Sequence, residues 1–113
     1  MMLSHYKEQD IEIVEIAGRL TLVDVAQARE KLKDIAQQGA GKMIIDLSQT
    51  TFMDSGGLSV LISAYKAVQS RNGRLVLAAP SASIQSLIEL TRLQHIFEIF
   101  QTKEAAIGAL GQG

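Results

Sequence analysis

The sequence of 113 residues has no cysteine, no excess of charge of one sign and no long apolar run. Without cysteine, disulfides, thiol nucleophiles and thiolate metal ligands are excluded. The formal net charge of -1 gives no general attraction to nucleic acid or to an anionic membrane surface. Charged residues interrupt every apolar run well before roughly 18 residues, and the N-terminus lacks the apolar core of a signal peptide. We therefore expect a cytoplasmic protein with no nucleic acid partner and no direct membrane insertion.

The composition is that of a packed globule, because 47% of the residues are hydrophobic and 20% are charged. A chain of this length favours one domain over residues 1–113, ordered over about residues 3–110. No internal repeat or low-complexity tract divides it.

Apolar residues alternate along the chain between the spacing of strands and that of helices. Two segments, 3–6 and 11–17, predict an opening antiparallel hairpin. Thr21-Leu22-Val23-Asp24 resembles a capping box and starts the first helix, which Gly39 and Gly41 end. Further strands are predicted at 43–47, 74–79 and 96–100, and further helices between 55 and 72, 80 and 91, and 102 and 110. This alternation implies an α/β fold: a mixed, mostly parallel sheet of four to five strands with four flanking helices.

The most informative stretch is a buried strand at 44–48 followed by a turn and by Ser55 at the start of a helix. Backbone N–H groups and the helix dipole favour negative charge there, so a phosphate on Ser55 would be tolerated. Asp54 or Ser55 could instead simply cap the helix. Capping does not explain Gly56 and Gly57, since each costs about 1 kcal/mol of helix propensity relative to alanine. Two glycines make the chain thin, so a partner's backbone or a phosphate donor could approach closely.

Motifs for catalysis and cofactor binding are missing from the sequence. His5 and His95 have no paired spacing that would make a metal site. A G-x-S-x-G nucleophile elbow would need glycine where Met53 stands, and neither a phosphate-binding loop nor a dinucleotide fingerprint occurs. A serine hydrolase that uses Ser55 with His95 as base is an alternative, but no residue order resembles a known triad. We expect no enzyme activity, no metal and no cofactor.

The stretch Phe52-Met53-Asp54-Ser55-Gly56-Gly57-Leu58, preceded by Ile44-Ile45-Asp46-Leu47-Ser48, resembles the central motif of the STAS domain of bacterial anti-sigma factor antagonists. Gly18-Arg19-Leu20 is similar to the family's Gly-x-Leu turn after the second strand. The resemblance implies a small STAS-like domain that works by partner switching. The unphosphorylated antagonist binds an ATP-dependent serine kinase that is also the anti-sigma factor, and so frees the sigma factor. Phosphorylation of the serine after the motif's aspartate breaks this binding, and a phosphoserine phosphatase restores it.

Carried over by position, the resemblance makes Ser55 the phosphoacceptor. The docking surface that it implies consists of Thr21, Leu22, Met53, Asp54, Gly56, Gly57, Leu58 and Ser59. Phe52, Met53 and Leu58 would supply apolar contact there, unless they belong to the core. Thr21 stands where the family has an acid close to the acceptor, and it brings a hydroxyl without a charge. This difference supports an alternative, a STAS interaction subunit of a transport or sensory complex without a phospho-switch.

Overall fold

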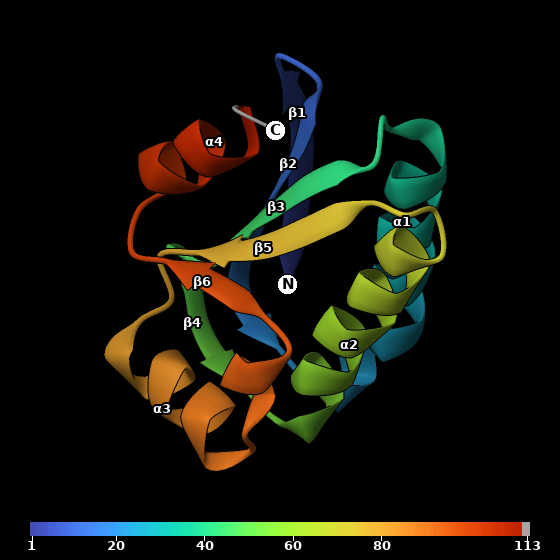
Figure 1. Cartoon of the computed structure of the whole chain (residues 1–113). Coiled ribbons are helices and arrows are strands. Elements are labelled where there is room, and N and C mark those ends of the chain that lie inside the picture. The colour runs from blue at the N-terminus through green and yellow to red at the C-terminus, as the bar shows by residue number, and fades with distance from the viewer. Residues whose placement is uncertain (112–113) are drawn as a thin grey trace.

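The structure is a computed structural model that describes residues 1–111 of the chain. Within these residues it has six strands, four α-helices and two short 3-10 turns (Figure 1). None of these helices has both the length and the apolar content needed to cross a bilayer. The strands are β1 (Met2–Glu8), β2 (Ile11–Leu20), β3 (Lys42–Asp46), β4 (Thr50–Met53), β5 (Arg74–Ala78) and β6 (Glu98–Phe100). The helices are α1 (Val25–Gln38), α2 (Ser55–Gln69), α3 (Ala82–Leu90) and α4 (Lys103–Gly111), and the 3-10 turns are η1 (Leu22–Asp24) and η2 (Leu93–His95).

The sheet has strand order β1-β2-β3-β5-β6, and β4 pairs with the end of β2. β1 runs antiparallel to β2, whereas all other pairings are parallel. The α/β class, the opening hairpin and the mixed, mostly parallel sheet with four helices are therefore confirmed. Each helix joins or follows strands in the order that the alternating pattern predicts.

Two details of the sheet differ from the prediction. The sequence pattern does not predict β4, so six strands are present where four to five are expected. The segment Gly18-Arg19-Leu20 is the end of β2, not a turn after it, because an irregularity between Gly18 and Arg19 brings the strand alongside β4. Gly18 has a φ of +85°, which glycine adopts without strain. The buried Thr50 hydroxyl fastens β4 by donating to the Ile16 carbonyl at 2.6 Å.

Helices cover both faces of the sheet (Figure 1). The larger core joins one face to α1, α2 and α3, and the smaller core joins the other face to α4. Each of these three helices turns an apolar face to the larger core, where Leu32, Leu61 and Ile88 are fully buried. Ala106 and Leu110 of α4 are buried in the smaller one. Polar groups and the candidate phosphoacceptor therefore lie outside the two cores.

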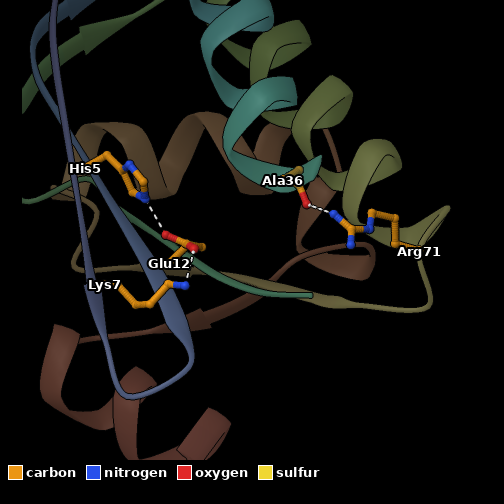
Figure 2. Close-up of polar contacts among 5 residues, drawn as sticks. All are labelled: His5, Lys7, Glu12, Ala36 and Arg71. Atoms are coloured by element: carbon orange, nitrogen blue, oxygen red, sulfur yellow. Dashed lines mark hydrogen bonds and ion pairs between the residues drawn. The ribbon is translucent and has the colours of Figure 1, made fainter. Parts of the chain in front are cut away.

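A buried carboxylate lies near the start of β2 (Figure 2). Glu12 is hydrogen-bonded to the ring of His5 and lies 3.4 Å from Nζ of Lys7, and both partners come from β1. Close by, the Arg71 guanidinium after α2 donates to the carbonyl of Ala36 in the last turns of α1 (Figure 2). These contacts join β1 to β2 and α1 to α2.

Candidate phosphorylation and docking site

Ser55 is the first residue of α2, and the residue before it caps the helix. The Asp54 side chain accepts a hydrogen bond from the backbone N–H of Gly57 at 3.0 Å. Asp54 therefore satisfies the helix N-terminus, as an N-cap residue does. The Ser55 side chain is exposed to solvent, and no hydrogen bond within residues 1–111 engages its hydroxyl. Asp54 thus provides the cap, and the hydroxyl of the neighbouring Ser55 is left exposed.

The second carboxylate oxygen of Asp54 reaches another segment of the chain. It accepts a hydrogen bond from the backbone N–H of Leu22, in η1, at 3.1 Å. The η1 loop is itself closed by Asp24, whose carboxylate accepts from the Thr21 N–H at 2.9 Å and from the Thr21 hydroxyl at 3.3 Å. The predicted capping box is confirmed. Asp54 thereby fixes the loop after β2 against the start of α2.

The hydrogen bonds to Asp54 also set its charge. The N–H groups of Gly57 and then of Leu22 stabilise the carboxylate and hold the pKa of Asp54 below its ordinary value. The carboxylate is therefore negative at neutral pH, directly beside Ser55. A phosphate on Ser55 would meet this charge, while the positive end of the α2 dipole would offset part of the repulsion.

The two glycines of the motif face the protein's own backbone. A Cβ at Gly56 would lie 2.6 Å from Cα of Leu22, and one at Gly57 would lie 2.5 Å from the carbonyl oxygen of Leu20. The interpretation that they thin the chain for a partner is therefore wrong. They are needed because α2 packs closely against β2 and η1. The predicted site residue Ser59 is half-buried, and its hydroxyl donates to the Gly56 carbonyl of its own helix at 2.6 Å.

Apolar side chains around Ser55 divide into buried and exposed ones. Met53 and Leu58 are only 5% and 6% exposed, so they belong to the core and do not offer the apolar docking contact considered for them. Phe52 is 41% exposed, and Leu22 and Val23 of η1 are more exposed still. Val23 was missed because it lies inside a capping motif, and only its neighbourhood with the exposed Leu22 draws attention to it.

A groove of about 250 Å³ lies between β4 and α3. Phe52 borders it from β4, and Ile84, Leu87 and Leu90 border it from α3. Leu90 is 82% exposed. Arg19 lies over the ring of Phe52, with Cζ 4.3 Å from the ring centroid. Sequence reasoning missed Arg19 and the groove because both depend on the pairing of β4, which the sequence pattern does not predict.

The described residues do not join Ser55 to His95, the base considered in the hydrolase alternative. His95 is the last residue of η2 and is exposed, and no hydrogen bond in the described part of the chain joins it to Ser55. Within residues 1–111 no histidine is hydrogen-bonded to the Ser55 hydroxyl to activate it for attack on a substrate, and both oxygens of the neighbouring Asp54 carboxylate accept backbone N–H bonds. The hydrolase alternative therefore has no geometric support.

The fold and the site together define a class of protein. It is a small α/β domain with an exposed serine at a helix start, flanked by exposed apolar side chains, which are features of a domain that contacts other proteins. The family model of the STAS domain matches residues 3–106, and the chain belongs to the STAS domain family. The resemblance inferred from the central motif is thus confirmed.

Comparisons with individual proteins agree with this assignment. An anti-sigma-B factor antagonist of Bacillus subtilis (strain 168) is 35% identical over 100 residues, which cover 88% of this chain and 90% of that protein. The Bacillus cell fate determinant SpoIIAA in its phosphorylated form has a TM-score of 0.74 at 21% identity, with 96% and 98% of the two chains covered. A sulfate transporter family protein from Wolinella succinogenes has a TM-score of 0.81 at 16% identity, with 93% and 88% covered. The last two share the fold.

Proposed function

We propose that this protein is a cytoplasmic anti-sigma factor antagonist that acts by partner switching. Unphosphorylated, it binds a serine-kinase anti-sigma factor, which holds the ATP, and phosphorylation of Ser55 releases it. The observation that carries the proposal is the exposed Ser55 hydroxyl at the first position of α2, with Asp54 as the cap. The identity to an anti-sigma-B factor antagonist of Bacillus subtilis supports it.

The chemistry belongs to the partner. The kinase would transfer the γ-phosphoryl group of ATP to Oγ of Ser55: the new O–P bond forms, the bond to ADP breaks, and a base of the kinase takes the hydroxyl proton. A separate phosphoserine phosphatase would hydrolyse the ester and restore the hydroxyl. This protein supplies the acceptor and the docking surface, so it is a substrate and a regulator, not an enzyme.

Phosphorylation changes the docking surface far more than the fold. A phosphoserine adds about -1.5 to -2 charge and three acceptor oxygens beside Asp54. The N-terminus of α2 offsets part of the repulsion within the domain. In a docked interface the phosphate must be desolvated against a surface shaped for a hydroxyl, at a cost of several kcal/mol. A loss of about 4 kcal/mol weakens binding roughly a thousandfold, so affinity can switch without a large conformational change.

The test compares three variants for binding to the serine-kinase anti-sigma factor of the same organism and for phosphorylation by it. Ser55→Ala should bind and resist phosphorylation, and Ser55→Asp should bind far more weakly than the wild type. Ser70→Asp adds the same charge just beyond the other end of α2, about 20 Å away, and should bind normally. Mass spectrometry should find the phosphate on Ser55. Phosphate elsewhere, or normal binding by Ser55→Asp, would refute the proposal.

A second function keeps the fold without the switch. Thr21 supplies no acid next to the acceptor, and the fold is shared with a sulfate transporter family protein. In this alternative the chain is an interaction subunit of a transport or sensory complex. Co-purification with a membrane transporter, together with full function of Ser55→Ala in cells, would favour it over partner switching.

A further inference from the structure

Arg19 and Phe52 form an exposed pair next to the candidate site. They lie opposite each other in the parallel pairing of β2 with β4, and the guanidinium lies over the ring. Arg19 takes part in none of the ion pairs within residues 1–111, whereas Arg74 is paired with Glu98 through two hydrogen bonds of 2.8 and 2.6 Å. The charge of Arg19 is therefore open to another molecule, and its position is held by the ring.

The pairing that holds Arg19 continues directly into the docking surface. Leu20 pairs with Met53, and two residues beyond Leu20 the N–H of Leu22 bonds to Asp54. Two residues, Met53 and Asp54, separate Phe52 from Ser55, a span of about 10 Å in extended chain. Phe52 also borders the groove that α3 completes. A cation, an exposed aromatic ring and an apolar groove are thus continuous with the phosphoacceptor.

We propose that Arg19 is a specificity-determining residue of this surface, and that it selects a protein partner with a carboxylate side chain next to an apolar one. The guanidinium is a planar fork that matches a carboxylate, and its stacking on Phe52 reduces the freedom lost on pairing. The apolar side chain of the partner enters the groove beside Leu87 and Leu90. This inference rests on the proposed function, since the partner is the protein that binds when Ser55 is unphosphorylated.

Charge complementarity is the argument for this occupant. The groove supplies area and apolar contact, which many sequences could satisfy, but an exposed and uncompensated arginine at its edge favours an acidic side chain and disfavours a basic one. Arginine and aromatic residues are also enriched among those that carry most of the energy of an interface. Arg19 and Phe52 supply both types at one point.

The experiment measures binding of the full chain to the purified serine-kinase anti-sigma factor of the same organism, by surface plasmon resonance with ADP present. Arg19→Ala should weaken binding at least tenfold, and Arg19→Glu about a hundredfold, mainly by slowing association. Arg19→Lys keeps the charge without the fork and should fall between the wild type and Arg19→Ala. Lys33→Glu makes the same change of charge on an exposed residue of α1 and should bind within twofold of the wild type.

Two further measurements test the role of the Arg19 charge: the salt dependence of binding, and binding to charge-reversal variants of the partner. Raising NaCl from about 50 to 500 mM should weaken the wild type more than Arg19→Ala, since salt screens an exposed charge pair. Among Asp→Lys and Glu→Lys variants of the partner, one should restore binding to Arg19→Glu. Urea unfolding of each variant shows that the protein used is folded.

Failure of this inference is distinguishable from failure of the proposed function. If Ser55→Asp loses binding while Arg19→Ala and Arg19→Glu bind within twofold of the wild type, the role of Arg19 is refuted and partner switching stands. The role of Arg19 is also refuted if its substitution changes binding only when Ser55 is phosphorylated. Normal binding by Ser55→Asp refutes the proposed function, whatever the Arg19 variants do.

Discussion

At the start of α2, the two oxygens of a single carboxylate hold two segments together. One oxygen of Asp54 caps the helix through Gly57, and the other holds η1 through Leu22. Asparagine can cap a helix with its single side-chain oxygen, but its NH₂ group cannot accept from the Leu22 N–H. Asp54→Asn therefore separates the two roles, whereas Asp54→Ala removes both.

We expect the midpoint of urea unfolding to fall in the order wild type, Asp54→Asn, Asp54→Ala at pH 7. The pKa of Asp54 is lowered in the folded protein, so its stabilisation is present above the unfolded pKa of about 3.9 and is lost as the pH falls through the folded value. The difference between wild type and Asp54→Ala should thus shrink as the pH is lowered from about 5 to 2.5. Asp34→Ala, at an exposed acid of α1, serves as control, and a difference independent of pH would contradict the assignment.

Replacement by alanine should have opposite effects on the free energy of unfolding at the two glycines of α2 and at a glycine in α4. Gly56→Ala and Gly57→Ala bring a Cβ against the backbone of Leu22 and Leu20, so each should lower the free energy of unfolding by about 1–3 kcal/mol. Gly108 lies in α4 with open space where a Cβ would be. Gly108→Ala should raise the free energy of unfolding by about 0.5–1 kcal/mol, since alanine favours the helix. Urea unfolding of the three variants checks the signs, and stabilisation by all three would contradict the packing of α2.

At the scale of elements, the edge strand β1 is tied to β2 by the carboxylate of Glu12. This side chain is buried, and its partners His5 and Lys7 both come from β1 (Figure 2). Replacing both partners by alanine leaves a buried charge unpaired, which should lower the free energy of unfolding by about 2 kcal/mol or more. In a Glu12→Gln background the same double replacement should cost less than about 1 kcal/mol. Equal losses in the two backgrounds, measured by urea unfolding, would show that Glu12 needs neither partner.

Local signals explain which elements the sequence predicts. The α2 start could be placed because an apolar strand, an N-cap aspartate and an apolar helix face follow one another closely along the chain. The strand β4 could not, because Thr50–Met53 is only four residues long and its partners at Gly18–Leu20 are about 30 residues away. Its stability comes from that distant pairing and from the buried Thr50 hydroxyl, neither of which leaves a periodic pattern.

Dependence on contacts that are distant in the sequence also explains the outcome at the candidate site. Ser55 and its helix are local, and the sequence predicts them. Which apolar neighbours are buried depends on the packing of α2 against β2 and of β4 against α3, so Met53 and Leu58 could not be told apart from Phe52. The role of the glycines was missed for the same reason, since the atoms they avoid belong to a segment more than 30 residues earlier.

At the scale of the whole molecule, stability and docking reside in different places. The cores lie between the sheet and its helices, whereas the exposed apolar residues near Ser55 lie at η1, β4 and α3. In the proposed function, a phosphate on Ser55 would act on the second group. Substitutions of leucine by alanine can therefore separate the two properties in one protein.

Leu110 and Leu90 are the matched pair for that separation. Leu110 of α4 is 1% exposed, so Leu110→Ala should lower the free energy of unfolding by about 2–4 kcal/mol. It should leave the affinity of the folded protein for the anti-sigma factor unchanged. Leu90 is 82% exposed at the groove, so Leu90→Ala should change stability by less than about 0.5 kcal/mol. It should weaken partner binding about tenfold, because an apolar side chain in the groove loses its contact. Urea unfolding and surface plasmon resonance on both variants give the two quantities, and normal binding by Leu90→Ala would remove the groove from the docking surface.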